Sequence, residues 1–356
     1  MRQVGWIVLV AGAMVGCGGD HLGDRGDGGE TPADAADVEG GSLDAGSLDA
    51  GGGEPGLAIV SPADGASFVR DDVVGTGEWA ARIPIEVRAV GLASIELVAD
   101  GDFALGTITP PATTLTYDFL GDGARTITAI GRGPDGAELA RDEIAITITA
   151  PADTSCHAML DALGIDWEAV GATPGIADPV RVQPVIGGVR YRYVSNAEPT
   201  AMLMDCELAP RLARLSEVVA PYGIDEVIHI GIYNYRCIGG GDPDSGTCTP
   251  SQHAYARAID LHAFGLADSD VEYSTETDFA ITMRADACPI PSSSEADRVL
   301  KEIACELWAE RVFQIILTPN YNDAHRNHYH VDLTEGSMYL GESAAGIDPI
   351  GGGPAH

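Results

Sequence analysis

Short runs of alternating apolar and polar residues fill the chain from residue 57 to about residue 149. Alternation with a period of two places apolar side chains on one face of a β-strand, and it is clearest over residues 83–89, 94–99, 125–130 and 143–148. The pairs Asp100-Gly101 and Asp135-Gly136 are turn signals beside such runs. The pattern predicts an antiparallel all-β sandwich over residues 57–150.

A different pattern begins at Pro151, where apolar residues recur at helical spacing between short strand-like runs. Residues 202–220 show this helical spacing. Capping residues indicate where two further helices start: Thr154 or Ser155 for a helix that reaches Ala162, and Ser294 for one with the apolar stripe Val299, Ile303 and Leu307.

Strand-like runs lie between these helices, at residues 189–194, 226–235, 258–264 and 312–318. In the second run, Ile228, Ile230 and Ile232 would form one apolar face. Helices mixed with short strands predict an α+β domain over residues 151–340, with a small antiparallel sheet and flanking helices. A flexible tail is expected over residues 341–356.

The N-terminus has the pattern of a targeting segment. Arg2 precedes an apolar run over residues 4–15, which is too short to span a bilayer. The run ends at Gly16-Cys17 and resembles the lipobox of bacterial lipoproteins, in which the cysteine is lipidated and becomes the mature N-terminus. An ordinary secretory signal with a chance cysteine is the alternative. Both interpretations predict export, and the first predicts a lipoprotein of the bacterial cell envelope, in the periplasm or at the outer membrane or cell surface.

The composition predicts a linker after the N-terminal segment and argues against nucleic acid as a binding partner. Residues 17–56 are mostly Gly, Asp, Ala, Glu and Ser, which predicts a disordered acidic tether after a signal peptide at residues 1–16. The whole chain has 54 acidic and 20 basic residues, a formal charge of −34. Such a chain lacks the basic surface that binds phosphates, so nucleic acid is not an expected partner.

Six cysteines remain once Cys17 is set aside, and all lie beyond residue 150. An even number in an exported chain predicts disulfides rather than thiolate metal ligands. Fifteen pairings are possible; we favour the pairing of neighbours, namely Cys156–Cys206, Cys237–Cys248 and Cys288–Cys305.

Three of the nine histidines fall between residues 325 and 330. On a β-strand, His328, His330 and Asp332 would share one face, with apolar residues on the other. One strand cannot close a metal site, but His253 and, seven residues later, Asp260 lie upstream. Two imidazoles and one carboxylate are the ligand set of a catalytic zinc site, which keeps a fourth position open.

The motif is specific enough to indicate a family. Ser251, His253 and Asp260 match the pattern SxHxxGxAxD of the D-Ala-D-Ala metallopeptidase (hedgehog-type zinc peptidase) superfamily, except that Ala256 stands where Gly is usual. The stretch from residue 320 to 333 looks like the extensin-like C-terminal domain branch, and the likeness covers roughly residues 156–335. Residues 57–150 resemble the bacterial immunoglobulin-like domains that precede catalytic modules, and a spacer or weak binding role is expected there.

The resemblance assigns roles residue by residue. It implies zinc as the cofactor, His253, Asp260 and His330 as its ligands, and His328 as the general base or proton shuttle. Beyond the resemblance, the positions of four further residues make them candidates to contact a zinc ligand or the substrate: Ser251, His325, Asp332 and Arg236. The resemblance also implies an exported zinc peptidase that acts on peptidoglycan stem peptides, as a carboxypeptidase or an endopeptidase.

Plainer interpretations exist for several of these residues. The clustered histidines could form a surface patch, Ser251 could only shape a turn, and Arg236 could face solvent. His262 could be solvated or contact a ligand, and His229 is expected to be a hydrogen-bonded core histidine. The acidic loop at residues 242–246 lacks the ligand spacing of a calcium site. The alternative function is a zinc-containing module of the same fold that binds cell wall or protein without catalysis.

Overall fold

The computed structural model of the protein describes residues 54–75, 77–282, 288–289 and 291–341. The expected signal peptide, Cys17, the linker up to residue 53 and the tail from residue 342 lie outside these ranges. Among the described residues, no helix combines the length and the apolar character needed to cross a bilayer.

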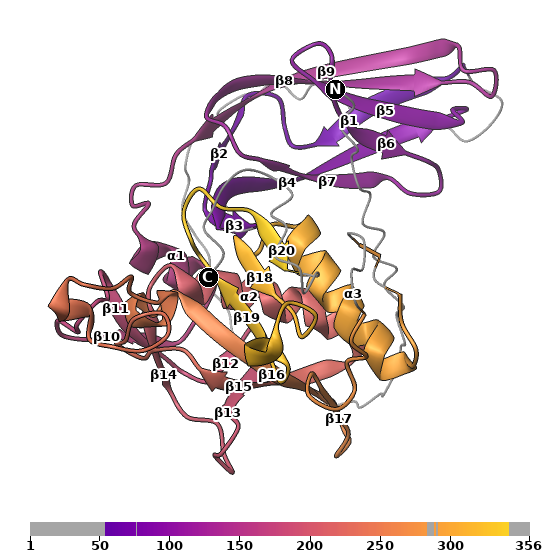
Figure 1. The fold of residues 1–356 in the computed structure, drawn as a ribbon. Coiled ribbons are helices and arrows are strands. Elements are labelled where there is room, and N and C mark those ends of the chain that lie inside the picture. Colours follow the sequence, from indigo (N-terminus) through magenta and orange to yellow (C-terminus); the bar gives the residue numbers. More distant parts are fainter. Residues whose placement is uncertain (1–53, 76, 283–287, 290, 342–356) are drawn as a thin grey trace, which may run out of the picture. The chain divides into compact units, whose positions relative to one another are not determined.

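The N-terminal domain is a β-sandwich, as the alternating pattern predicts (Figure 1), but it is not entirely antiparallel, since residues 66–69 pair in parallel with residues 146–149. One sheet has the order β1-β4-β3, with β7 paired to β4, and the other has the order β2-β9-β8-β5-β6. Its strands are β1 Gly56–Ser61, β2 Ala66–Val69, β3 Asp72–Val74, β4 Glu78–Val90, β5 Ser94–Ala99, β6 Phe103–Ile108, β7 Thr114–Phe119, β8 Gly123–Arg132 and β9 Glu138–Thr149. Alternate residues of β4 and β9, including Ile83, Ile85, Ile146 and Ile148, are buried between the sheets.

The C-terminal domain contains three α-helices, four short 3₁₀-helices and eleven strands among its described residues. The helices are α1 Cys156–Ala162, α2 Leu208–Val219, α3 Glu295–Ala309, η1 Ala220–Tyr222, η2 Pro243–Ser245, η3 Gln252–Tyr255 and η4 Asp323–His325. The strands are β10 Trp167–Ala169, β11 Pro179–Val182, β12 Val185–Ile186, β13 Val189–Tyr193, β14 Met202–Asp205, β15 Ile224–Gly231, β16 Ala258–Leu266, β17 Glu272–Ser274, β18 Ile315–Leu317, β19 Tyr329–Asp332 and β20 Tyr339–Gly341.

The main sheet differs from the small antiparallel sheet that the sequence predicts. It has eight strands in the order β12-β13-β15-β16-β19-β18-β20, with β17 paired to β16, and the pairs β13·β15 and β18·β20 are parallel. A parallel pair needs a long crossover connection, and the chain between β13 and β15 supplies one with β14 and α2. Such non-local pairing leaves no signature in the periodicity of the sequence. The predicted sheet was therefore too small, and its strands were wrongly expected to be all antiparallel. A second sheet has the order β10-β11-β14.

The predicted helix starts are confirmed at two places. Ser155 caps α1 by accepting a hydrogen bond from the Ala158 N–H, and Ser294 caps α3 by accepting one from the Asp297 N–H. The helix predicted over residues 202–220 is only partly present. Residues 202–205 instead form β14, which pairs with β11, because this pairing satisfies their backbone groups while both Met202 and Met204 are buried.

Two strand predictions are longer than the strands that form. β15 ends at Gly231 rather than at residue 235, and β18 covers only Ile315–Leu317 of the predicted 312–318. In β15, Ile224 and Val227 belong to the apolar core cluster. Of the predicted isoleucine face, Ile228 is buried and Ile232, just beyond the strand, joins that cluster, whereas Ile230 is only partly buried. Irregularities in the pairing with β16 interrupt the predicted alternation.

The core of this domain leaves one sheet face for the site. Ile259 and Leu261 of β16, together with Tyr329 and Val331 of β19, pack in one apolar cluster with residues of α2 and α3. Since neighbouring residues of a strand point to opposite faces, Asp260 and His330 project away from that cluster.

Three disulfides join neighbouring cysteines, as favoured from the sequence: Cys156–Cys206, Cys237–Cys248 and Cys288–Cys305. All three lie in the C-terminal domain, and they are consistent with an extracytoplasmic protein.

Candidate metal centre

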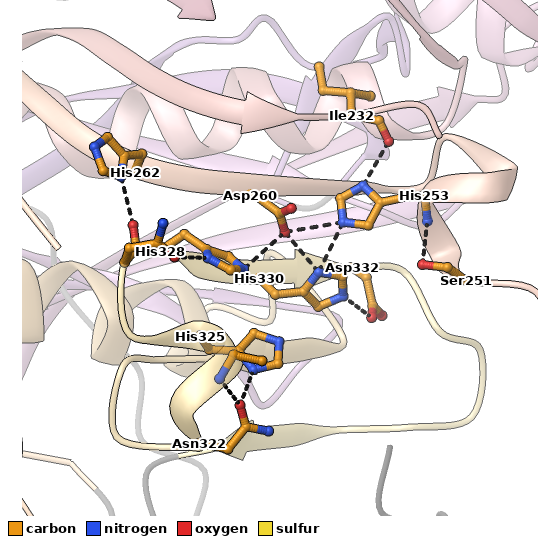
Figure 2. Close-up of polar contacts among 12 residues, drawn as sticks. Ile232, Ser251, His253, Asp260, His262, Asn322, His325, His328, His330 and Asp332 are labelled. Carbon is orange, nitrogen blue, oxygen red and sulfur yellow. Dashed lines mark hydrogen bonds and ion pairs between the residues drawn. The ribbon is translucent and has the colours of Figure 1, made fainter. Parts of the chain in front are cut away.

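Three donor atoms from two parts of the chain, residues 253–260 and His330, meet on the face of the main sheet opposite the apolar cluster. His253 Nε2 lies 3.1 Å from Asp260 Oδ1 and 3.2 Å from His330 Nδ1, and His330 Nδ1 lies 3.0 Å from the same Asp260 oxygen. Figure 2 shows the three side chains converging from η3, β16 and β19. The structure therefore brings together the three ligands expected from the sequence.

Pairing of two strands places two of these donors side by side. β16 and β19 are antiparallel, and their register sets Asp260 directly opposite His330. Directly opposite residues share a face of the sheet. The apolar side chains at 259, 261, 329 and 331 fix that register, since a slip by one residue would turn them out of the core.

The short helix η3 delivers the third donor. Ser251 caps it, with Oγ accepting a hydrogen bond of 3.3 Å from the His253 N–H, so Ser251 shapes the turn. Ala256 ends it in the left-handed conformation, at φ 52° and ψ 33°. A residue with a Cβ is disfavoured there by about 1–2 kcal/mol relative to glycine, which explains why the related motif usually has Gly at this position. The turn nevertheless accommodates alanine.

The other ring nitrogen of each histidine has an acceptor of its own. His253 Nδ1 donates to the Ile232 carbonyl over 2.8 Å, and His330 Nε2 donates to Asp332 Oδ2 over 2.9 Å. A carbonyl and a carboxylate can only accept, so these nitrogens carry the hydrogens. In the neutral rings, His253 Nε2 and His330 Nδ1 then turn unprotonated lone pairs toward each other and toward the Asp260 carboxylate.

Electrostatics requires positive charge between these atoms. Burial disfavours the charged form of Asp260, yet the hydrogen bonds from His253 and His330 hold its pKa well below its usual range. Burial likewise lowers the pKa of His330, but the carboxylates of Asp260 and Asp332 raise it to about 9. Without a metal ion, a proton on His330 provides that positive charge; a metal ion would replace the proton.

The donor set fits zinc. Zn–N and Zn–O bonds of about 2.0–2.1 Å at tetrahedral angles would separate ligand atoms by roughly 3.3 Å, close to the 3.0–3.2 Å found here. Each ligand histidine also has the backbone or carboxylate partner that typically orients such ligands. His253, Asp260 and His330 are therefore a candidate site with three protein ligands.

Another group of potential ligands lacks this fit. His157 and Asp178 lie near Cys206, but Cys206 is bonded to Cys156 and offers no thiolate. His157 Nε2 is 3.0 Å from Asp178 Oδ1, an ordinary polar contact.

His328 lies at the edge of the candidate site. It directly precedes β19, and its Nε2 is 3.6 Å from Asp260 Oδ1. Its Nδ1 donates to Asn327 Oδ1 over 2.8 Å, which leaves the Nε2 lone pair facing the site. Burial lowers the pKa of His328 and Asp260 acts in the opposite direction.

Two more histidines lie beside His328 or bind the segment that carries it. The His325 ring centroid is 5.2 Å from that of His328, and its Nδ1 is 2.7 Å from Asn322 Oδ1. Burial, reinforced by the neighbouring histidines, lowers the pKa of His325 to about 4. His262 Nδ1 donates to the Asn327 carbonyl over 2.7 Å (Figure 2). It therefore anchors the segment that carries His328, a contact that the sequence left open.

The remaining expected residues lie in different surroundings. Among the residues that the structure describes, the exposed Arg236 side chain forms no hydrogen bond or ion pair, and Arg236 contacts the site only through its backbone carbonyl, which accepts a hydrogen bond of 3.0 Å from the Ser251 N–H. His229 is buried, as expected, but its Nδ1 has no hydrogen-bond partner there.

Sequence reasoning missed Ile232, Asn322 and Asn327, which hold the histidines by a carbonyl or an amide oxygen. Asn322 and Asn327 flank His325 within the histidine-rich segment, and that proximity was the one available signal. The carbonyl of an apolar residue gives none.

Comparisons with known proteins show that the C-terminal domain matches a protein family. Residues 154–340, more than half of the 356 residues, match a family model described as Extensin-like protein C-terminus. No curated protein matches the chain at a significant level. Among solved structures, the fibronectin(III)-like modules of Clostridium thermocellum CbhA are 17% identical, with 27% of this chain and 96% of that chain covered and a TM-score of 0.21. A β-glucuronidase of Parabacteroides merdae is also 17% identical, with 36% of this chain and 15% of that chain covered and a TM-score of 0.21.

Proposed function

Because this chain belongs to the extensin-like protein C-terminus family, and because that domain carries a His–Asp–His centre, we propose that it is a zinc-dependent peptidase. The observation that carries the proposal is the arrangement of the three donor atoms within 3.2 Å of one another. Both ligand imidazoles are held in the tautomer that turns a lone pair inward. A surface patch of histidines would not need such fixed partners.

A bound zinc ion would supply Lewis acidity that polarises a peptide carbonyl and lowers the pKa of water. The protein's own part is to orient and to move protons. His253, Asp260 and His330 would hold the ion, with His253 fixed by the Ile232 carbonyl and His330 by Asp332.

His328 is our candidate for the proton relay. Burial keeps its imidazole uncharged at neutral pH, so Nε2 can accept a proton, while Nδ1 stays bound to Asn327. A general base must reach the proton that it takes, directly or through one water, and Nε2 is 3.6 Å from a ligand oxygen.

The compartment supports the choice of substrate. The three disulfides fit an exported chain, and the N-terminal pattern ending at Cys17 resembles that of lipoproteins. We therefore propose peptidoglycan stem peptides as the substrate, and attachment to the cell envelope through a lipid on Cys17.

Metal analysis and digestion of purified muropeptides test the proposal. We expect about one zinc ion per chain, peptide products with the wild type, and neither with the double variant His253→Ala, His330→Ala. His157→Ala is the matched control, because it removes a histidine outside the site and should retain zinc and activity. Absence of zinc from the wild type would refute the metal centre.

His328→Ala separates a peptidase from a binding module of the same fold. A peptidase should keep its zinc and lose activity by about 10²–10⁴-fold. A wild type that holds zinc and binds murein, yet cleaves nothing and is unchanged by His328→Ala, would favour the non-catalytic module.

A further inference from the structure

A hollow of the C-terminal domain lies at the ends of β13 and β15. It has a volume of about 280 Å³, and its lining includes Tyr193, Met202, Leu203, His229, Gly231 and Tyr233. The remaining lining residues are Thr200, Ala201 and Ile232, so no acidic, lysine or arginine side chain contributes to its wall. A hollow of this size accommodates about one amino-acid residue, since sites for drug-sized ligands begin near 300 Å³.

The one imidazole in the wall is uncharged near neutral pH. His229 is only 6% exposed, and burial lowers its pKa to about 4. Its ring meets the Tyr193 ring edge-to-face, with centroids 5.7 Å apart. The wall is therefore aromatic and apolar with a few neutral polar groups, and a charged group entering it would lose hydration without gaining an ion pair.

Gly231 connects this pocket with the candidate metal centre. It lies directly opposite Asp260 in the antiparallel pair β15·β16, so a side chain at position 231 would project on the same face as the ligand carboxylate. A Cβ added there would meet no atom within 4 Å, which means that the space above Gly231 is open.

A second contact makes the same connection. Ile232, which also lines the pocket, provides the carbonyl that accepts the hydrogen bond from His253 Nδ1. The end of the pocket is thus formed by the two residues that adjoin Asp260 and His253.

We propose that this pocket is a substrate subsite that receives one uncharged residue of the peptide, next to the bond that is cut, and that Gly231 keeps the passage to the metal centre open. This inference rests on the proposed peptidase function. It adds a preference: uncharged residues are accepted at this subsite, and acidic or basic residues are excluded.

Gly231→Leu in the full-length chain tests the passage. The backbone at Gly231 is not in the left-handed region, so the leucine enters open space without backbone strain. Gly171→Leu is the matched control, because Gly171 also has open space around it and an ordinary backbone but does not line the pocket. Both variants should retain wild-type zinc content and melting temperature.

Synthetic stem peptides that carry alanine, glutamate or lysine beside the cleaved bond provide the probes. On one side of the cleaved bond, we expect the alanine peptide to be cleaved with a kcat/KM at least about tenfold higher than that of the glutamate or lysine peptide. Gly231→Leu should lower kcat/KM for that peptide by at least about tenfold, mainly through KM, whereas Gly171→Leu should match the wild type. Equal behaviour of the two leucine variants, or a preference for a charged residue at every position, would overturn the inference.

Equilibrium binding of the peptides tests the subsite independently of peptidase activity. If the wild type holds zinc but cleaves none of the peptides, the peptidase proposal fails, and calorimetric binding of the same peptides still decides whether the pocket accepts them. If Gly231→Leu loses zinc, Tyr193→Ala decides instead, because Tyr193 is exposed and lies on β13, which β15 separates from the strand that carries Asp260. Weaker binding of the alanine peptide by Tyr193→Ala supports the subsite, and unchanged binding refutes it.

Discussion

Each histidine of the candidate centre is held by an acceptor that fixes its tautomer. The acceptors differ in kind: a backbone carbonyl for His253, a carboxylate for His330, and an amide oxygen for His328. Because each acceptor binds the nitrogen away from Asp260, the opposite nitrogens face the same point. Because each ring is already oriented, little further conformational entropy is lost when its nitrogen binds a metal ion.

His229 allows a test of burial at the scale of one residue. Its folded-state pKa of about 4 lies below the ordinary value of 6.5, so between these values the unfolded chain binds more protons than the folded one. The free energy of unfolding should therefore fall as pH decreases from 6.5 to 4, by about 3 kcal/mol from this residue. Above pH 6.5 the residue contributes no pH dependence.

His229→Leu should remove this part of the acid sensitivity. Urea unfolding at pH 7 and at pH 4.5 measures the difference in free energy, and the variant should lose less stability than the wild type over that interval. Equal losses in the two proteins would contradict a buried, uncharged His229.

At the scale of elements, a buried ion pair on α3 holds two neighbouring segments, residues 280–282 and residues 291–293. Asp297 accepts hydrogen bonds from the backbone N–H groups of Ala280 and Ser293, and Lys301 Nζ, 2.9 Å from Asp297, also donates to Thr282 and to the Pro291 carbonyl. The Lys301 side chain is 2% exposed. These contacts attach residues 280–282 and residues 291–293 to one helix.

Lys301→Met should therefore destabilise the domain, because it leaves the Asp297 carboxylate buried without its countercharge. We expect a loss of about 3–5 kcal/mol in urea unfolding. The control on the same helix is Arg298→Ala, whose side chain is 41% exposed and forms ion pairs with Glu295 and Glu302. Such a surface network should contribute less than about 1 kcal/mol. Comparable losses from both substitutions would show that burial does not decide the strength of the pair.

At the scale of the whole molecule, covalent links are concentrated in one domain. Every disulfide of the described residues lies in the C-terminal domain, while the β-sandwich is held by an apolar interior and by non-covalent polar contacts. Cys156–Cys206 has the largest sequence separation, 50 residues, compared with 17 for Cys288–Cys305 and 11 for Cys237–Cys248.

Loop entropy predicts the order in which the disulfides matter. Replacing both cysteines of a pair by alanine should cost about 4 kcal/mol for Cys156–Cys206 and about 3 kcal/mol for each of the other two. Thermal and urea unfolding of the three double variants measure this order. If removal of Cys156–Cys206 caused the smallest loss of stability of the three, strain or residual structure, rather than loop length, would govern how much each disulfide stabilises the domain.

The sequence alone determined the chemistry of the candidate site and much of the local structure. Residue type and spacing pointed to His253, Asp260 and the histidine-rich strand, and the resemblance to the SxHxxGxAxD motif singled out His330 as the third expected ligand. The caps Ser155 and Ser294 also followed from the sequence, since capping is a local hydrogen bond. The alternation over residues 57–149 identified the sandwich for the same local reason.

Only the tertiary structure decided which atoms meet. The register of β16 with β19 and β15 sets Asp260 between His330 and Gly231, and the carbonyl of Ile232 selects the free nitrogen of His253. Pairings between strands far apart in sequence depend on how apolar faces pack, which a one-dimensional pattern does not encode. For that reason the mixed eight-stranded sheet, the role of His262 and the pocket beside Gly231 could not be read from the chain.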